Sequence, residues 1–137
     1  MSQPIELLIA DDSKQDCDLL AIAARSTALA PTFVSTREAV LPAIDARPSC
    51  YRAILLDINM PSQPLPNLVT DILGHPDGRT MLILALSDLS PASGEPIAQA
   101  AGIERFVRKP ASLDQLVAFL YGLESELRAG SSSSAII

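Results

Sequence analysis

The sequence has 137 residues, of which 48% are hydrophobic and 19% are charged, and its formal net charge is −6. This balance predicts one globular domain with a single core, and the lack of a basic stripe argues against nucleic acid or an anionic membrane as a direct partner. No apolar run is long enough to span a bilayer, and the N-terminus lacks a signal-peptide pattern, so we expect a cytoplasmic protein. Cys17 and Cys50 fit no metal spacing, and we expect both to be reduced thiols.

Short apolar segments alternate with helical patterns along the chain. The predicted strands, in order, are IELLIA (5–10), PTFVST (31–36), AILLDI (53–58), MLILAL (81–86) and RFVRK (105–109). The predicted helices cover residues 13–27, 37–46, 66–74, 95–102 and 112–129. Three of the strands are almost continuously apolar, as in a parallel sheet covered on both faces, so the alternation predicts a doubly wound α/β sandwich. Residues 1–129 form the predicted domain, and GSSSSAII (130–137) is expected to be a flexible tail.

Polar side chains stand where the apolar segments end. Asp11 and Asp12 follow the first segment, Asp57 comes near the end of the third, Ser87 follows the fourth, and Lys109 ends the fifth. Parallel strands joined by right-handed crossovers have their carboxyl ends on one edge of the sheet, where ligands bind. We therefore expect three carboxylates, a hydroxyl and an ammonium group to meet at that edge.

These residue types together suit phosphoryl chemistry. Clustered carboxylates repel one another unless a cation lies among them, and oxygen ligands with open positions suit Mg²⁺. Lys109 is one of only two lysines in the chain, and an ammonium group binds phosphoryl oxygens as a point charge. The set predicts a site in which Asp57 is the nucleophile toward phosphorus while Mg²⁺ spreads the charge.

Each of these residues also has an ordinary structural explanation. An Asp-Asp pair before a helix is usually an N-cap with a solvated neighbour, a lone Asp after a strand is usually a turn residue, and Ser87 could simply end a strand. The functional interpretation depends on all of them occurring in the right order at the ends of successive predicted strands.

With these residues in view, the chain resembles the receiver domains of two-component response regulators over about residues 4–127. The resemblance is carried by the acidic pair (Asp11, Asp12), by Asp57 followed by x-x-Met-Pro, by Ser87 at the end of the fourth strand, and by Lys109-Pro110 after the fifth. It implies a flavodoxin-like fold of five parallel strands in the order 2-1-3-4-5, flanked by five helices.

The resemblance also implies roles and partners. Asp12 and Asp57 would ligate Mg²⁺ directly, Asp11 would do so through water, and Asn59 through its backbone carbonyl. Asp57 would accept phosphate from a histidine kinase or a histidine phosphotransfer protein. Ser87 would then move toward the phosphoryl group and the ring of Phe106 would turn, changing the surface of the fourth helix, fifth strand and fifth helix.

Further expectations concern output and partners. Only a short tail follows the last predicted helix, so we expect output by protein–protein contact, and one expected form is a homodimer through the fourth helix, fifth strand and fifth helix. The segment HPDGRTMLILALS (75–87) and the long last helix are also similar to small single-domain regulators paired with bacterial phytochromes. His75 is interpreted as a turn residue rather than a phosphate carrier.

Three features depart from the family pattern. The loop SQPLPN (62–67) replaces an Asp-Gly pair, Asp88 stands where a small residue is usual, and the fourth helix is expected to be short and bounded by Pro91, Gly94 and Pro96. These departures leave open a second function, a receiver-like interaction module that ignores phosphate. A phosphohydrolase is a third possibility, but such enzymes carry an acid–base Asp where this chain has Asn59, so we expect no enzyme activity on outside substrates.

Overall fold

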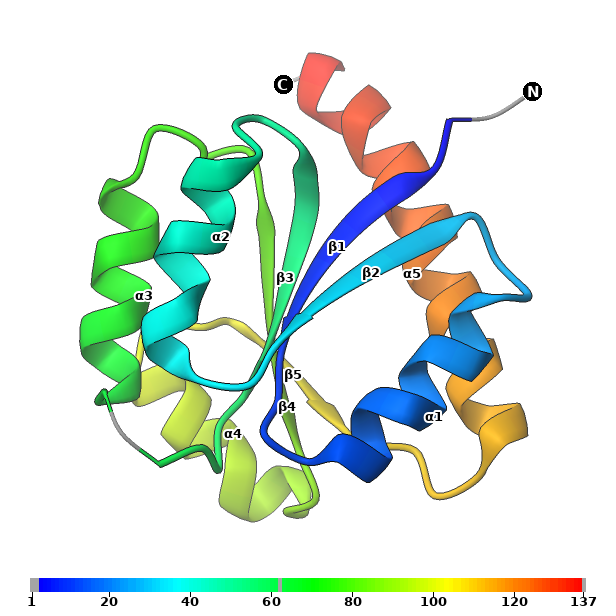
Figure 1. The fold of residues 1–137 in the computed structure, drawn as a ribbon, viewed down its shortest axis with the longest axis horizontal. Coiled ribbons are helices and arrows are strands. Elements are labelled where there is room, and N and C mark those ends of the chain that lie inside the picture. The colour runs from blue at the N-terminus through cyan, green and yellow to red at the C-terminus, as the bar shows by residue number, and fades with distance from the viewer. Residues whose placement is uncertain (1–2, 62, 137) are drawn as a thin grey trace.

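The protein is described by a computed structural model that covers residues 3–61 and 63–136, with side chains placed up to residue 129. Five parallel strands form one sheet in the order β2-β1-β3-β4-β5 (Figure 1). Their bounds are β1 Ile5–Ala10, β2 Leu29–Val34, β3 Tyr51–Asp57, β4 Leu82–Ser87 and β5 Arg105–Arg108. The doubly wound fold and the strand order are therefore confirmed.

Helices cover both faces of the sheet. The helical elements are α1 Lys14–Ala24, the 3₁₀ helix η1 Arg37–Ala39, α2 Val40–Ala46, α3 Leu65–Gly74, α4 Pro91–Ala100 and α5 Leu113–Ile136. α1 and α5 pack on one face, while α2, α3 and α4 lie on the other (Figure 1). This arrangement leaves the carboxyl ends of the strands uncovered by the helix bodies, since each helix starts after a loop at that edge.

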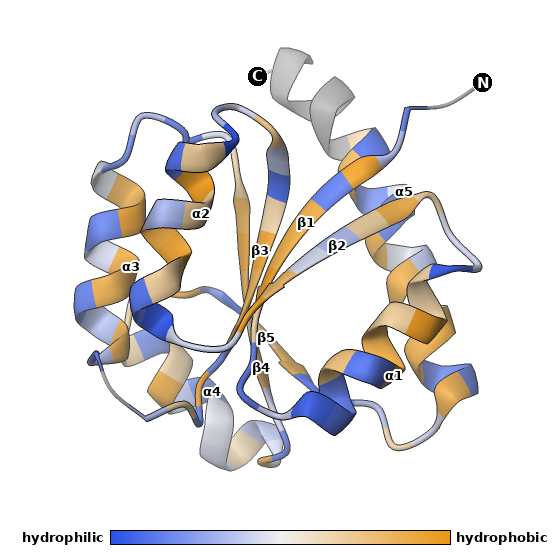
Figure 2. Ribbon diagram, viewed as in Figure 1, coloured by the Kyte–Doolittle hydropathy of each residue, from blue (hydrophilic) through white to orange (hydrophobic). Residues whose placement is uncertain are grey.

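The alternation of side chains along the strands divides the core into two halves. In β3, Ile54 and Leu56 face the α2–α3–α4 side, whereas Ala53 and Leu55 face the α1–α5 side. All four are at most 1% exposed. A strand whose two faces are both buried has a nearly continuous apolar sequence, which explains why β1, β3 and β4 are hydrophobic along most of their length (Figure 2).

Several predicted boundaries were wrong. β2 begins at Leu29 rather than Pro31, and β3 begins at Tyr51. α4 was expected to be short, yet it starts at Pro91 and continues through Gly94 and Pro96 to Ala100. Pro91 is tolerated because the first helical residues have no intrahelical acceptor for their N–H groups. Pro96 lies further inside the helix.

The division into a domain of residues 1–129 and a flexible tail of residues 130–137 stays a prediction. The backbone of α5 continues as helix to Ile136, but the side chains of residues 130–136 and the whole of residue 137 lie outside the described part.

Candidate functional site

The site lies at the carboxyl edge of the sheet, where four strands end in polar residues. β1 leads into Asp11 and Asp12, β3 ends at Asp57, β4 ends at Ser87, and β5 leads into Lys109. Because β1, β3, β4 and β5 are neighbours with the same direction, these ends are adjacent in space. In Figure 1 this edge is the end of β1 from which the chain turns into α1.

Three carboxylates meet at this edge. Asp11, Asp12 and Asp57 each offer an oxygen, and the three oxygens lie within 4.8 Å of one another. Asp11 and Asp57 are 1% and 4% exposed, whereas Asp12 is exposed to solvent. A set of hard oxygen donors with one side open to water is a set that Mg²⁺ can use, because Mg²⁺ keeps several waters and takes few carboxylates. The residues present therefore fit a magnesium ion.

Lys109 reaches into the same cluster with a side chain that is 13% exposed. Its Nζ lies 2.7 Å from Asp16 Oδ2, 2.9 Å from Asp11 Oδ2 and 3.1 Å from Asp57 Oδ2. The backbone places it, since Lys109 N donates to the carbonyl of Ser87 at 2.7 Å, which extends the pairing of β4 and β5 by one residue. One ammonium group is thus shared by three carboxylates.

Burial and charge set the protonation of this cluster. Burial is the largest factor that raises the pKa of Asp11 to about 6, and the nearby Asp57 carboxylate adds to the rise. Hydrogen bonds from Ser13 N and from Lys109 act in the opposite direction. Burial alone would lower the pKa of Lys109, but hydrogen bonds to Asp16 and Asp11 raise it above its ordinary value, so the ammonium form persists at neutral pH.

Local backbone hydrogen bonds orient two of the carboxylates. Asp11 Oδ1 accepts from Ser13 N, and Asp57 Oδ1 accepts from Asn59 N, both at 2.9 Å. In each case the Asp carboxylate accepts a hydrogen bond from the backbone N–H two residues later in the sequence. Asp favours such turns because its short side chain can reach that N–H group. In each carboxylate the other oxygen is left for Lys109 or a metal. Asn59 lies in the turn that follows β3, and its carbonyl as a magnesium ligand stays a prediction.

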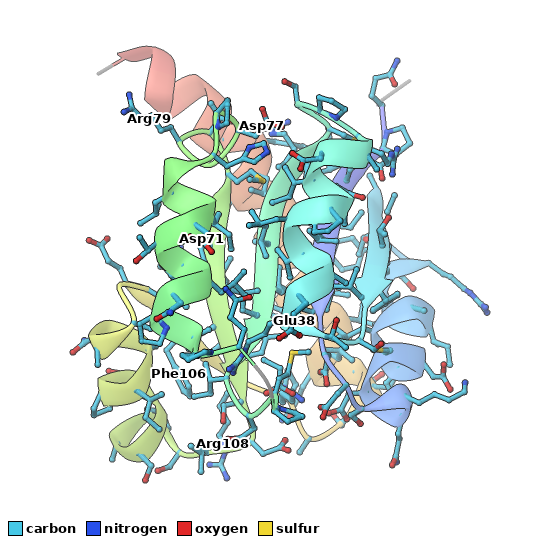
Figure 3. The ribbon with its side chains drawn as sticks, turned by 60° about the vertical axis from the view of Figure 1, so that its left-hand side comes forward. Glu38, Asp71, Asp77, Arg79, Phe106 and Arg108 are labelled. Carbon is cyan, nitrogen blue, oxygen red and sulfur yellow. The ribbon has the colours of Figure 1, made fainter. Side chains whose placement is uncertain are left out.

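Ser87 is the last residue of β4, and Phe106 lies on the neighbouring strand β5. Ser87 is fully buried, and its Oγ accepts from Leu89 N at 3.0 Å. Phe106, labelled in Figure 3, is half-buried and packs against the core on the α2–α3–α4 side. A Cβ atom on the buried Gly94 of α4 would overlap the Phe106 ring, so this glycine makes room for the ring in its present position. The switching roles of Ser87 and Phe106 stay predictions.

The structure adds two residues that the sequence analysis did not select. Asp16, in the first turn of α1, makes the shortest contact to Lys109. Arg37, in η1, is 5% exposed and donates to backbone carbonyls around Asp57. An acidic residue in a first helical turn looks like ordinary compensation of the helix dipole, and nothing in the sequence distinguishes Arg37 from a surface arginine.

Asp88 and the proline-rich loop, which depart from the family pattern, both lie near the site. Asp88 is exposed and lines an open cleft together with Arg108, Lys109, Pro110, Ala111 and Gln115. An extra carboxylate therefore stands at the opening that leads to Lys109. Pro61 and Pro64 lie in the loop between Asp57 and α3, and α3 starts directly after Pro64.

Among the described residues, no helix has the length and apolar character needed to cross a membrane.

Comparison with solved structures identifies the fold. A response regulator in red light signalling of R. palustris is 24% identical, with a TM-score of 0.72, covering 87% of this chain and 90% of that chain. The phosphorylated cyanobacterial phytochrome response regulator RcpA is 21% identical with a TM-score of 0.75, covering 93% and 96%. The Mn²⁺-bound form of the response regulator Rcp1 is 19% identical with a TM-score of 0.66, covering 89% and 93%.

No protein-family model and no curated protein matches the sequence. The structural likeness nevertheless spans most of the chain, and the protein has the flavodoxin-like fold of response regulator receiver domains.

Proposed function

We propose that the protein is a single-domain response regulator that accepts a phosphoryl group on Asp57 in a magnesium-dependent phosphorelay. The observation that carries this proposal is the convergence of Asp57 with Asp11, Asp12 and Lys109 at the carboxyl edge of the sheet. The donor would be a histidine kinase or a histidine phosphotransfer protein. A cytoplasmic location belongs to the same proposal.

The chemistry follows from the residues. A carboxylate oxygen of Asp57 attacks phosphorus, the P–N bond of the donor phosphohistidine breaks, and its electron pair leaves with the imidazole. Asp11, Asp12 and Asp57, with the carbonyl of Asn59, would hold Mg²⁺, which when bound neutralises charge on the transferring phosphoryl group. Lys109, already 3.1 Å from Asp57 Oδ2, would bind a phosphoryl oxygen. Asn59 has an amide in the position of an acid–base group, which supports signalling rather than turnover of outside substrates.

Partner and output are finer parts of the proposal. Two of the similar structures are described as red light or phytochrome response regulators, which supports a bacteriophytochrome as the kinase. Output would occur by protein contact, with a homodimer through α4, β5 and α5 as one form. Ile97 on α4 and Tyr121 on α5 support this, since they are 45% and 50% exposed.

The test is a titration with beryllofluoride, a phosphoryl mimic, in the presence and absence of Mg²⁺, followed by amide NMR. We expect Mg²⁺-dependent shifts around Asp57 and Phe106 in the wild type and none in Asp57→Asn. If the wild type shows no response to Mg²⁺ with beryllofluoride, the proposal is wrong.

A second candidate is a receiver-like interaction module that does not respond to phosphate. It is favoured by Asp88, which adds a negative charge at the opening of the site. Asp88→Ala distinguishes the two cases. In a phosphate-responsive receiver both the wild type and this variant bind beryllofluoride, whereas in a module that Asp88 keeps unresponsive only the variant binds it.

A further inference from the structure

Arg37 is a buried cation that binds the backbone of the loop after the proposed phosphate acceptor. It is 5% exposed, and its guanidinium makes its hydrogen bonds to carbonyl oxygens. Arg37 Nη1 donates to Gln63 O at 2.8 Å, and Nη2 donates to Ile58 O at 3.0 Å and to Asp57 O at 3.4 Å. Taking a charge out of water is costly unless hydrogen bonds replace its hydration. The carbonyl groups of the loop therefore stabilise the buried guanidinium of Arg37.

The loop needs an external hydrogen-bond donor because its prolines have no backbone N–H group. Pro61 and Pro64 carry no N–H group and cannot close turns by donating to nearby carbonyls. η1 supplies the missing partners from outside: Glu38 Oε2 accepts from Gln63 N at 3.0 Å, while Arg37 binds Gln63 O. Figure 3 labels Glu38, which lies in η1 directly before α2. Both backbone polar groups of Gln63 therefore bind side chains of η1.

The peptide group that joins Ile58 to Asn59 links Arg37 to the side chain of Asp57. Its carbonyl accepts from Arg37 Nη2 at 3.0 Å, and its N–H donates to Asp57 Oδ1 at 2.9 Å. The chain has no cis peptide bonds in its described part, and a trans peptide is planar with its C=O and N–H pointing in opposite directions. The guanidinium and the carboxylate thus bind opposite sides of the same rigid unit.

We propose that Arg37 is a positioning residue for phosphoryl acceptance, which fixes and polarises the Ile58–Asn59 peptide and thereby orients the carboxylate of Asp57. This inference rests on the proposed function. A charged donor on a peptide carbonyl strengthens the hydrogen bond that the N–H of the same peptide donates, because chained hydrogen bonds polarise one another. The sheet holds the preceding peptide, since Ile58 N donates to Leu86 O at 3.0 Å.

The experiment compares Arg37→Met, which removes all donors, with Arg37→Lys, which keeps a charge but not the planar set of donors. At saturating Mg²⁺ and acetyl phosphate, we expect Arg37→Met to lower the maximal rate of phosphorylation by ~10- to 100-fold, the usual effect of removing a group that orients a ligand. Arg37→Lys should regain part of that rate. The Asn59 amide proton resonance should move upfield in both variants, and further in Arg37→Met, as its bond to Asp57 weakens.

Two controls separate positioning from general loop stability. Arg105→Met breaks an exposed ion pair with Glu126 and should leave both the rate and the Asn59 resonance unchanged. Glu38→Ala frees Gln63 N in the same loop but leaves the Ile58–Asn59 peptide in place, so it should lower stability without moving the Asn59 resonance.

The proposal is overturned if folded Arg37→Met keeps the wild-type rate and Asn59 resonance, or if Glu38→Ala reproduces the effects of Arg37→Met. Should Arg37→Met fail to fold, the same two measurements are made on Arg37→Lys, and a wild-type rate together with a wild-type Asn59 resonance in that variant overturns the proposal. A wild type that takes up no phosphate would contradict the proposed function, and the Asn59 resonance of the variants would then still decide the role of Arg37.

Discussion

Asp11 is a buried carboxylate whose charge is opposed by its surroundings. Burial raises its pKa from 3.8 to about 6. Since the folded protein holds this proton more tightly than the unfolded chain, the contribution of Asp11 to stability is present below pH 3.8 and is lost as the pH rises through about 6. A metal ion that needs the ionised carboxylate must compete with that proton.

This competition predicts a pH dependence of magnesium binding. We expect the stabilisation by Mg²⁺, measured as the rise in melting temperature, to be large above pH 6 and to fall as the pH drops below about 6. In Asp11→Asn, the change near pH 6 should disappear. A stabilisation that is equally large at pH 5 and pH 7.5 in the wild type would show that Asp11 does not titrate in the magnesium site.

Lys109 supplies the positive charge among the carboxylates in the absence of metal. Lys109→Met leaves Asp11, Asp16 and Asp57 without their shared partner. Breaking a buried ion pair from one side costs about 3 kcal/mol, and we expect a loss of that order in the free energy of unfolding without Mg²⁺. Added Mg²⁺ should recover much of it. Denaturant unfolding in EDTA and in Mg²⁺ measures the free energy of unfolding under each condition. If Lys109→Met lowers that free energy equally in EDTA and in Mg²⁺, Lys109 and the metal do not share the carboxylate site.

The sequence predicted the meeting of Asp11, Asp57 and Lys109 because each of them directly ends an apolar strand. Asp16 and Arg37 could not be predicted in this way. Asp16 lies in the first turn of α1 and not at the end of a strand, and Arg37 binds backbone carbonyls, which every residue possesses. Contacts of that kind depend on loop geometry, and no spacing in the sequence encodes it.

At the scale of single elements, α4 differs from its prediction. Two prolines and a glycine argued for a short helix, yet α4 covers ten residues. Gly94 has a specific neighbour, since it is buried against the ring of Phe106. Helix propensity alone would disfavour glycine there, and tertiary packing overrides it.

The packing of Gly94 can be tested by adding one methyl group. Gly94→Ala gains about 1 kcal/mol of helix propensity but forces the Phe106 ring to move, and overpacking costs about 1–3 kcal/mol, so we expect a net loss of stability. Gly122→Ala in α5 is the matched control, because a Cβ there meets nothing within 4 Å and should stabilise the protein. The double variant Gly94→Ala, Phe106→Leu should recover stability, and if it does not, the ring is not what the methyl group meets.

At the scale of the whole molecule, the two halves of the core hold the sheet from both faces, and the site lies where the strands leave that core. The order of the strands followed from the family resemblance, because composition and periodicity indicate only alternating strands and helices. The proposed kinase and output partner could not be predicted, because exposed side chains would select them and neither periodicity nor fold specifies those.

The most direct test of the account is to locate the phosphoryl group. The protein is incubated with acetyl phosphate, with and without Mg²⁺, and its peptides are analysed by mass spectrometry. We expect one phosphoryl group on Asp57, formed only with Mg²⁺ and absent from Asp57→Asn. The lack of any modification, or modification at another residue such as His75, would contradict it.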